Sequence, residues 1–156
     1  MNEAASVCGC RRLLTSEMTK ITLDADFDNL DEIREFVGEA ASQVGFSDKE
    51  IYSIQLAADE ASSNVIEHAY AGMQSGKIEI ECVIFDGGLK IVMQDQGKSF
   101  NPSNIPEPNL KADLSERKIG GLGMYLMRKL MDEVTYESLE DAGNILTMIK
   151  RIGDDG

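Results

Sequence analysis

The chain has 156 residues, 42% of them hydrophobic and 28% charged, which are the proportions of an ordinary globular domain. This length is typical of one domain with a sizeable core. The 28 acidic residues outnumber the 15 basic ones and give a net charge of −13, so direct binding to DNA, RNA or an anionic membrane is disfavoured. Such a surface favours a protein partner with a basic face.

The sequence predicts neither a membrane segment nor an export signal. No stretch approaches the ~20 apolar residues that span a bilayer, and the N-terminal stretch lacks the apolar region of a secretory signal. We therefore expect a cytoplasmic protein, with a flexible arm at residues 1–17 and a folded domain at residues 18–152. Cys8 and Cys10 lie in the arm, where two thiols without a nearby His or third Cys are a weak basis for a metal site. Cys82 lies in a strand pattern and is expected in the core.

Two elements are expected before the most informative part of the chain. Lys20 to Asp24 alternates like a short strand. A helix follows, capped by Asp28 or Asn29 and ended by Gly45. Its predicted apolar stripe consists of Leu30, Ile33, Val37, Ala40, Ala41 and Val44.

Residues 48–70 combine two patterns. Apolar residues at steps of three and four predict a helix with one face in the core. Glu60, Asn64 and His68 form a second stripe, in which neighbours lie about one turn (roughly 5.4 Å) apart. This stripe could be a site that combines a carboxylate, an amide and an imidazole, or a polar helix edge that faces water. The core-facing residues are expected to be Ile51, Ile54, Ala58, Ala61, Val65 and Ala69.

Two hairpins are predicted where the hydrophobic period changes from about 3.6 to 2. Residues 77–85 and 89–94 are expected as strands, joined by the strong turn signal Asp86-Gly87-Gly88. Residues 134–138 and 144–150 predict a closing hairpin around a turn between Glu140 and Asn144.

Between the hairpins, residues 95–118 show no periodicity and hold all three prolines. A loop of this length in a small domain is typical of a functional lid or of a disordered insert. The glycine-rich stretch 119–123 then opens a helix, whose apolar seam we expect at Leu122, Leu126 and Leu130.

The predicted order is strand, helix, helix, strand, strand, loop, helix, strand, strand. Strands outnumber helical connections, so most of the sheet must be antiparallel. The sequence therefore predicts an α/β (α+β) two-layer sandwich, with a mixed, mostly antiparallel sheet and the helices on one face.

Two further features point to ligand binding. Gly120, Gly121 and Gly123 at a helix start would let backbone N–H groups approach a polyphosphate, although a glycine-rich turn is often only a turn. Asp95 ends a strand, and its carboxylate could accept a hydrogen bond from the exocyclic amine that adenine has and guanine lacks at C6. Gly97 would let the base lie close to the backbone. The alternative is a plain Asp-x-Gly turn.

The polar stripe can be interpreted in the same terms. Asn64 offers an amide oxygen to Mg²⁺, an ion that protein groups and phosphates commonly share. Glu60 could accept a proton from an attacking hydroxyl. His68 is the only histidine, which excludes a multi-histidine metal site; its simplest interpretation is a packed or capping imidazole.

Together, ADEASSNVIEHAY, DQGKSFNP and GGLGMYLMRKLMDEV resemble the N, G1 and G2 boxes of the histidine-kinase-like (GHKL) ATPase superfamily. Within it, residues 19–151 are most similar to the bacterial anti-sigma-factor serine/threonine kinases. The resemblance implies a Bergerat fold that binds ATP under a lid at residues 96–118. At matching positions it implies Asn64 as a Mg²⁺ ligand and Glu60 as catalytic base. The implied nucleotide contacts are Asp95 and Gly97 at adenine and Gly121 and Gly123 at the phosphates.

Kinases of this kind phosphorylate a serine on a small anti-anti-sigma (STAS-type) protein. Many also sequester a sigma factor, often as homodimers, and neither nucleic acid nor membrane is an expected partner. A non-catalytic, nucleotide-gated protein-binding regulator is the alternative.

The chain departs from the superfamily pattern in one place. Many members carry a threonine pair after the glycine of the last hairpin, but here Gly143 is followed by Asn144 and Ile145, and Thr147 is the nearest threonine. Candidate cations for the γ-phosphate come from the predicted lid and are Lys98, Arg117 and Lys118.

Overall fold

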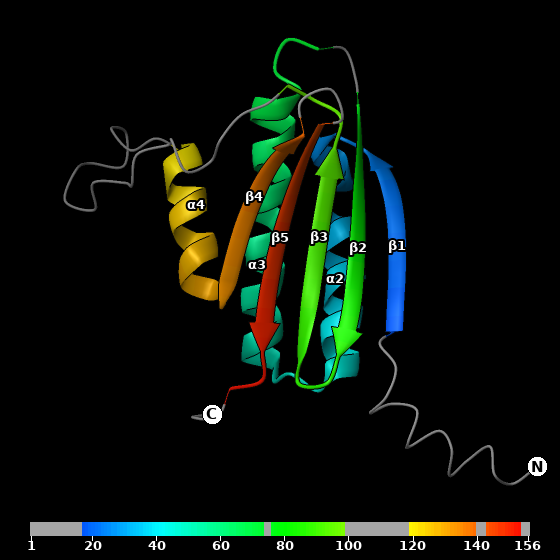
Figure 1. The fold of residues 1–156 in the computed structure, drawn as a ribbon, viewed down its shortest axis with the longest axis vertical. Helices are drawn as coiled ribbons and strands as arrows, with labels where there is room; N and C mark the ends of the chain where they lie inside the picture. Colours follow the sequence, from blue (N-terminus) through cyan, green and yellow to red (C-terminus); the bar gives the residue numbers. More distant parts are fainter. Residues whose placement is uncertain (1–16, 74–75, 99–118, 140–142, 154–156) are drawn as a thin grey trace, which may run out of the picture.

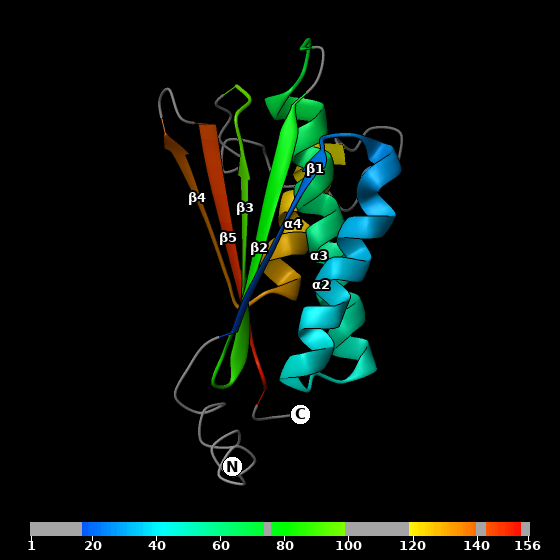
Figure 2. The same ribbon diagram turned by 90° about the vertical axis from the view of Figure 1, so that its right-hand side faces the viewer.

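The computed structural model describes residues 17–73, 76–98, 119–139 and 143–153, which form a five-stranded sheet with three α-helices on one face (Figures 1 and 2). The predicted two-layer α+β fold and the predicted order of elements are confirmed. Every pairing among the described strands is antiparallel, so the sheet is not mixed there. The predicted arm with Cys8 and Cys10 lies largely outside the described residues.

The sheet has the strand order β1-β2-β3-β5-β4. β3 and β5 are neighbours, and their register pairs Asp95 with Asn144 at one end. This register sets two polar side chains side by side at the edge of the core. The strands are β1 (Glu17–Asp24), β2 (Lys77–Phe85), β3 (Gly88–Asp95), β4 (Glu133–Leu139) and β5 (Gly143–Arg151).

The central helix, α3 (Asp48–Asn64), packs against both α2 (Leu30–Val44) and α4 (Ile119–Leu130). Ser47 and Glu50 begin α3 with a reciprocal capping box. The predicted helix over residues 48–70 is α-helical only to Asn64, and it continues as a π-helical turn, η2 (Val65–Ala69). A short 3₁₀ turn, η1 (Phe27–Asn29), precedes α2.

The core lies between the helices and the inner face of the sheet. The predicted apolar face of α3 is confirmed, since Ile54, Ala58 and Ala61 are buried. Cys82 is buried as predicted, and burial raises the pKa of its thiol to about 12, so the thiol stays protonated.

The predicted seam of α4 is wrong in register. The buried residues are Met127 and Met131, whereas Leu126 and Leu130 are only half-buried. The side chain of Leu122 lies outside the described residues. The stripes 126/130 and 127/131 are both wholly apolar, so the sequence pattern could not decide which of them faces α3.

Arg34 joins α2 to α3 through a partly buried ion pair. Its Nη2 and Nε donate to Asp59 Oδ2 at 2.9 and 3.0 Å, and the Asp59 side chain is only 19% exposed. We expect Arg34→Ala to lower the free energy of unfolding by about 1–3 kcal/mol, because it leaves a mostly buried carboxylate unpaired. Urea denaturation measures this loss.

Lys77→Ala is the matched control for that prediction. It removes an ion pair to Asp24 whose two side chains are 67% and 64% exposed. Such exposed pairs contribute about 0–1 kcal/mol, so the control should change stability little. Equal losses of unfolding free energy in the two variants would show that the α2–α3 ion pair stabilises the fold no more than an exposed ion pair does.

Every helix within the described residues is too short or too polar to cross a membrane.

Candidate active site

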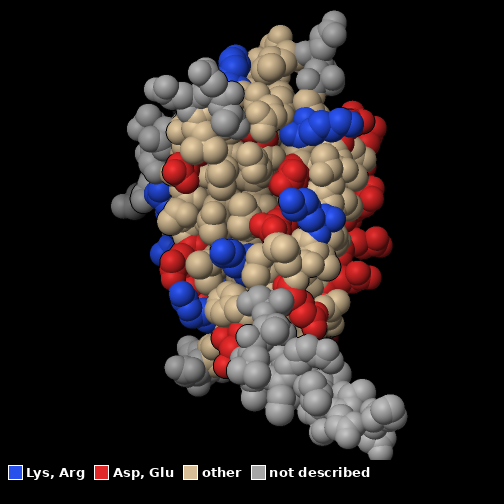
Figure 3. Space-filling model, turned by 45° about the vertical axis from the view of Figure 1, so that its right-hand side comes forward, with Lys and Arg blue, Asp and Glu red and all other residues tan. Residues whose placement is uncertain are grey.

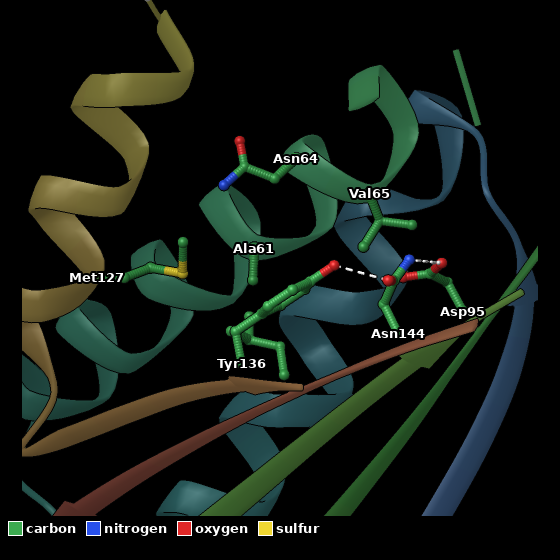
Figure 4. A pocket seen from close by; sticks show the side chains of 8 residues that line it. Ala61, Asn64, Val65, Asp95, Met127, Tyr136 and Asn144 are labelled. Atoms are coloured by element: carbon green, nitrogen blue, oxygen red, sulfur yellow. Dashed lines mark hydrogen bonds between the residues drawn. The ribbon is translucent and has the colours of Figure 1, made fainter. Parts of the chain in front are cut away.

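A pocket opens where the end of α3 meets α4 and the β3–β5–β4 part of the sheet (Figure 4). The empty space inside it measures about 260 Å³, open solvent included. Two of the predicted site residues, Asn64 and Asp95, come together here from distant parts of the chain. The lining residues are Ala61, Asn64, Val65, Asp95, Met127, Tyr136, Asn144 and Leu146.

Asp95 is the buried carboxylate of this pocket, with 3% of its surface exposed. Its Oδ1 accepts hydrogen bonds from the Gly97 backbone N–H and from Asn144 Nδ2, both at 2.8 Å. Burial raises the pKa of Asp95, and the two hydrogen bonds partly oppose that shift. Among the described residues both donors reach Oδ1 and none reaches Oδ2, so Oδ2 is left for a ligand.

Two glycines allow the backbone to pack tightly around Asp95. A Cβ on Gly97 would lie 2.4 Å from the carbonyl oxygen of Ala69, and a Cβ on Gly143 would lie 1.8 Å from that of Asp95. Gly143 also has a φ of +94°, which side chains of other residues disfavour. Gly97 is therefore required for packing against η2; its predicted contact with adenine stays a prediction.

Asn64 lies in the same pocket and is 4% exposed. Figure 4 shows its side chain projecting from α3 on the side of α4, away from the Asp95–Asn144 pair. Its amide Nδ2 is buried and has no hydrogen-bond partner among the described residues. A buried amide without a partner is costly, which fits a ligand that would complete its bonding.

The described residues contain no group of three or more His, Cys, Asp and Glu placed to hold a metal ion. A Mg²⁺ ion beside Asn64 would therefore depend on the amide oxygen, water and the oxygens of a ligand.

Glu60, the predicted base, is half-buried one turn before Asn64 and does not line the pocket itself. Burial raises the pKa of its carboxyl above the ordinary value of 4.5, and the negative charges of Asp59 and Glu67 raise it further. His68 belongs to η2 and is not among the lining residues either. Of the predicted polar stripe, only Asn64 reaches the pocket.

The structure describes the remaining predicted residues only in part. Gly121 and Gly123 lie in the N-terminal half of α4, so their backbone is helical. The expectation that they face the phosphates stays a prediction. Arg117 and Lys118 lie outside the described residues. Lys98 has an exposed side chain, and its backbone N–H donates to the Ala69 carbonyl at 2.6 Å.

Two pocket residues carry roles that the sequence did not predict. Asn144 takes the place of the first expected threonine and bonds Asp95 directly, while the Tyr136 hydroxyl donates to Asn144 Oδ1 at 2.6 Å. Thr147 lies an odd number of residues from the inward-facing Asn144, so it points to the opposite face of the sheet and cannot replace it. The sequence did contain a signal for the role of Asn144, because this residue directly follows the glycine of the last hairpin, where many superfamily members carry the threonine pair.

The family model of the histidine kinase-like ATPase domain matches residues 23–150. This chain belongs to that family. The chain is also 32% identical over 132 residues to the serine-protein kinase RsbW of Bacillus licheniformis. The aligned region covers 80% of this chain and 81% of that relative. It is 33% identical over 118 residues to RsbW of Listeria monocytogenes serovar 1/2a, with 73% and 74% covered.

A solved structure shares the fold. The crystal structure of the RsbU and RsbW domains of Rv1364c from Mycobacterium tuberculosis matches 86% of this chain with a TM-score of 0.60 and 21% identity. The chain spans about a third (32%) of that longer protein, so the match speaks for the fold alone. The family model thus confirms the predicted superfamily, and the solved structure confirms the predicted fold.

Proposed function

We propose that this chain is an ATP-dependent anti-sigma-factor kinase that transfers the γ-phosphate to a serine of a small anti-anti-sigma (STAS-type) protein. The observation that carries the proposal is the convergence of Asp95 and Asn64 in one pocket, with Glu60 one turn away on the same helix. The predicted enzyme class, a serine/threonine protein kinase, is confirmed by relatives that are named serine-protein kinases.

The residues present suit an adenine nucleotide. Asp95 Oδ2 would accept from the exocyclic amine of the base, and the apolar side chains of Val65, Met127 and Leu146 would exclude water around the ring. Asn64 would hold Mg²⁺ beside the phosphates, and the ion would neutralise part of their charge.

Glu60 would act on the incoming serine. Its carboxylate accepts the proton of the serine hydroxyl as the oxygen attacks the γ-phosphorus; the new O–P bond forms while the bond to the β-phosphate oxygen breaks and ADP leaves. The raised pKa of Glu60 makes it a better proton acceptor than an exposed glutamate.

Partners and location complete the proposal. We place the protein in the cytoplasm, where it would sequester a sigma factor and form homodimers. The face of the sheet that the described helices leave uncovered would serve such contacts; in Figure 3, which shows it obliquely from the side of β1, Lys, Arg, Asp and Glu lie among uncharged residues. One of the ion pairs on this face joins Lys20 to Glu79 at 3.3 Å. Sedimentation of the purified chain tests the dimer.

Incubation with labelled ATP, Mg²⁺ and a cognate anti-anti-sigma protein tests the kinase activity. We expect label on a serine of the partner and release of ADP. Absence of label from a partner that nevertheless binds would remove the catalytic part of the proposal.

A non-catalytic regulator is the second candidate function, because Glu60 does not line the pocket in this structure. In that case the nucleotide would only control binding of the partner. ATP-dependent capture of a sigma factor without phosphorylation of any partner would favour it.

Asn64→Ala tests the magnesium site. We expect the affinity for ADP in the presence of Mg²⁺ to fall about tenfold or more, since the lost interaction involves a charged group. The affinity with EDTA in place of Mg²⁺ should change much less. Calorimetry under both conditions measures the difference, and Ser63→Ala, next to Asn64 on α3, is the control. A loss of equal size with EDTA would contradict a role of Asn64 in metal binding.

A further inference from the structure

One side chain, Asn144, links three parts of the pocket wall. Its Nδ2 donates to Asp95 Oδ1 at 2.8 Å and to the Lys98 carbonyl oxygen at 2.9 Å, and its Oδ1 accepts from the Tyr136 hydroxyl at 2.6 Å. The residue is 1% exposed. A side-chain amide has two N–H hydrogens, so both are used here. Threonine could not replace it fully, because one hydroxyl hydrogen cannot serve both acceptors.

The backbone of Lys98 is held on both sides of its Cα. Its N–H donates to the Ala69 carbonyl at the end of η2, and its carbonyl accepts from Asn144 on β5. This fixes the neighbouring Gly97, whose N–H is the other donor to Asp95 Oδ1. Loss of Asn144 would therefore remove one donor to Asp95 and loosen the second.

The orientation of the Asn144 amide decides which groups face Asp95. With the amide turned over, its oxygen would face two acceptors, Asp95 Oδ1 and the Lys98 carbonyl. These two acceptors hold the amide with its nitrogen toward the carboxylate, and the Tyr136 hydroxyl donates to the amide oxygen that this orientation leaves on the other side. Figure 4 shows these three side chains as one chain of hydrogen bonds along the pocket.

We propose that Asn144, with its amide oxygen bonded by Tyr136, is a positioning residue that keeps Asp95 Oδ1 occupied, leaves Oδ2 for the base, and thereby sets a preference for adenine over guanine nucleotides. The inference rests on the proposed function, because it requires a nucleotide in the pocket. Guanine would present a carbonyl oxygen to Oδ2 and leave two buried acceptors facing each other.

The test compares the affinities of the full chain for ADP and GDP, with Mg²⁺, by calorimetry. We expect Asn144→Ala to lower the affinity for ADP about tenfold and to leave that for GDP nearly unchanged, so the ADP/GDP preference falls by the same factor. Asn144→Thr should keep part of the ADP/GDP preference that Asn144→Ala loses. Tyr136→Phe, which removes the hydroxyl bonded to the amide oxygen and leaves that oxygen without this donor, should reduce the preference about twofold to fivefold. Thr147→Ala, on the same strand but the opposite face, is the control.

Three results would count against the inference. An unchanged ADP/GDP preference in Asn144→Ala and Tyr136→Phe would overturn it, and so would an equal loss of affinity for both nucleotides, which indicates a purely structural role. If Asn144→Ala does not fold, Asn144→Thr and Tyr136→Phe decide. Failure of the unmutated chain to bind ADP would instead overturn the proposed function, and this inference with it.

Discussion

Glu60→Gln is expected to lower the rate of phosphate transfer by about 10²–10⁴-fold, the range that a positioned general base contributes. The amide keeps the shape of the side chain but cannot accept the serine proton. Because Glu60 lies outside the lining of the pocket, the affinity for ADP should stay nearly unchanged. Single-turnover transfer of labelled phosphate and calorimetry with ADP measure the two quantities separately.

Glu67→Gln is the matched control for this substitution. Glu67 is exposed on η2, seven residues and about two turns after Glu60, and contributes only its charge to the surroundings of Glu60. Its loss should leave transfer largely intact. Undiminished transfer by Glu60→Gln, or an equal loss in both variants, would remove Glu60 from the role of base.

The pH dependence of transfer gives an independent view of the same residue. A base must be ionised to act, so the rate should fall as the pH drops through the pKa of Glu60. That pKa is raised by burial and by the charges of Asp59 and Glu67, so the fall should be centred above 4.5. In Glu67→Gln the midpoint should move down, because one repelling charge is gone. An unmoved midpoint would mean that another group controls the profile.

Asp95→Asn is expected to weaken ADP binding about 100-fold. An asparagine amide keeps only one oxygen, so its NH2 group must face either the exocyclic amine of the base or Asn144 Nδ2. Either orientation leaves a buried donor facing a donor and removes the charge of the acceptor, a loss of the order of 1–3 kcal/mol. The affinity for GDP should fall less, because Asp95 does not favour guanine. Calorimetry with both nucleotides measures the effect.

Asp132→Asn makes the same chemical change at an exposed carboxylate outside the pocket, one that accepts from the Arg151 backbone N–H. It should leave both affinities nearly unchanged. A comparable loss in this control, or an Asp95→Asn variant that binds ADP as tightly as the unmutated chain, would show that Asp95 does not read the base.

Much of the fold follows from local patterns in the sequence. The period of two in β2 and β3, the turn at Asp86-Gly87-Gly88 and the stripe of α3 each depend on near neighbours, so they could be predicted. The seam of α4 could not, because Met127 and Leu126 are both apolar and only packing against α3 separates them. The π-helical end of α3 likewise depends on its surroundings and not on a motif.

The site could be predicted where a family motif names a residue, as for Asn64 and Asp95. The bond between Asp95 and Asn144 could not, since it requires the register of β3 with β5 across 49 positions of the chain. The threonine pair of many superfamily members is absent after Gly143, and the structure shows that the asparagine in its place bonds the carboxylate itself.

Titration of the purified chain with ADP and Mg²⁺ in a calorimeter tests the central claim most directly. We expect one site per chain for ADP, much weaker binding of GDP, and loss of most of the ADP heat in Asp95→Asn. No heat with ADP at high micromolar concentrations would show that Asn64, Asp95 and the start of α4 do not meet around an adenine nucleotide.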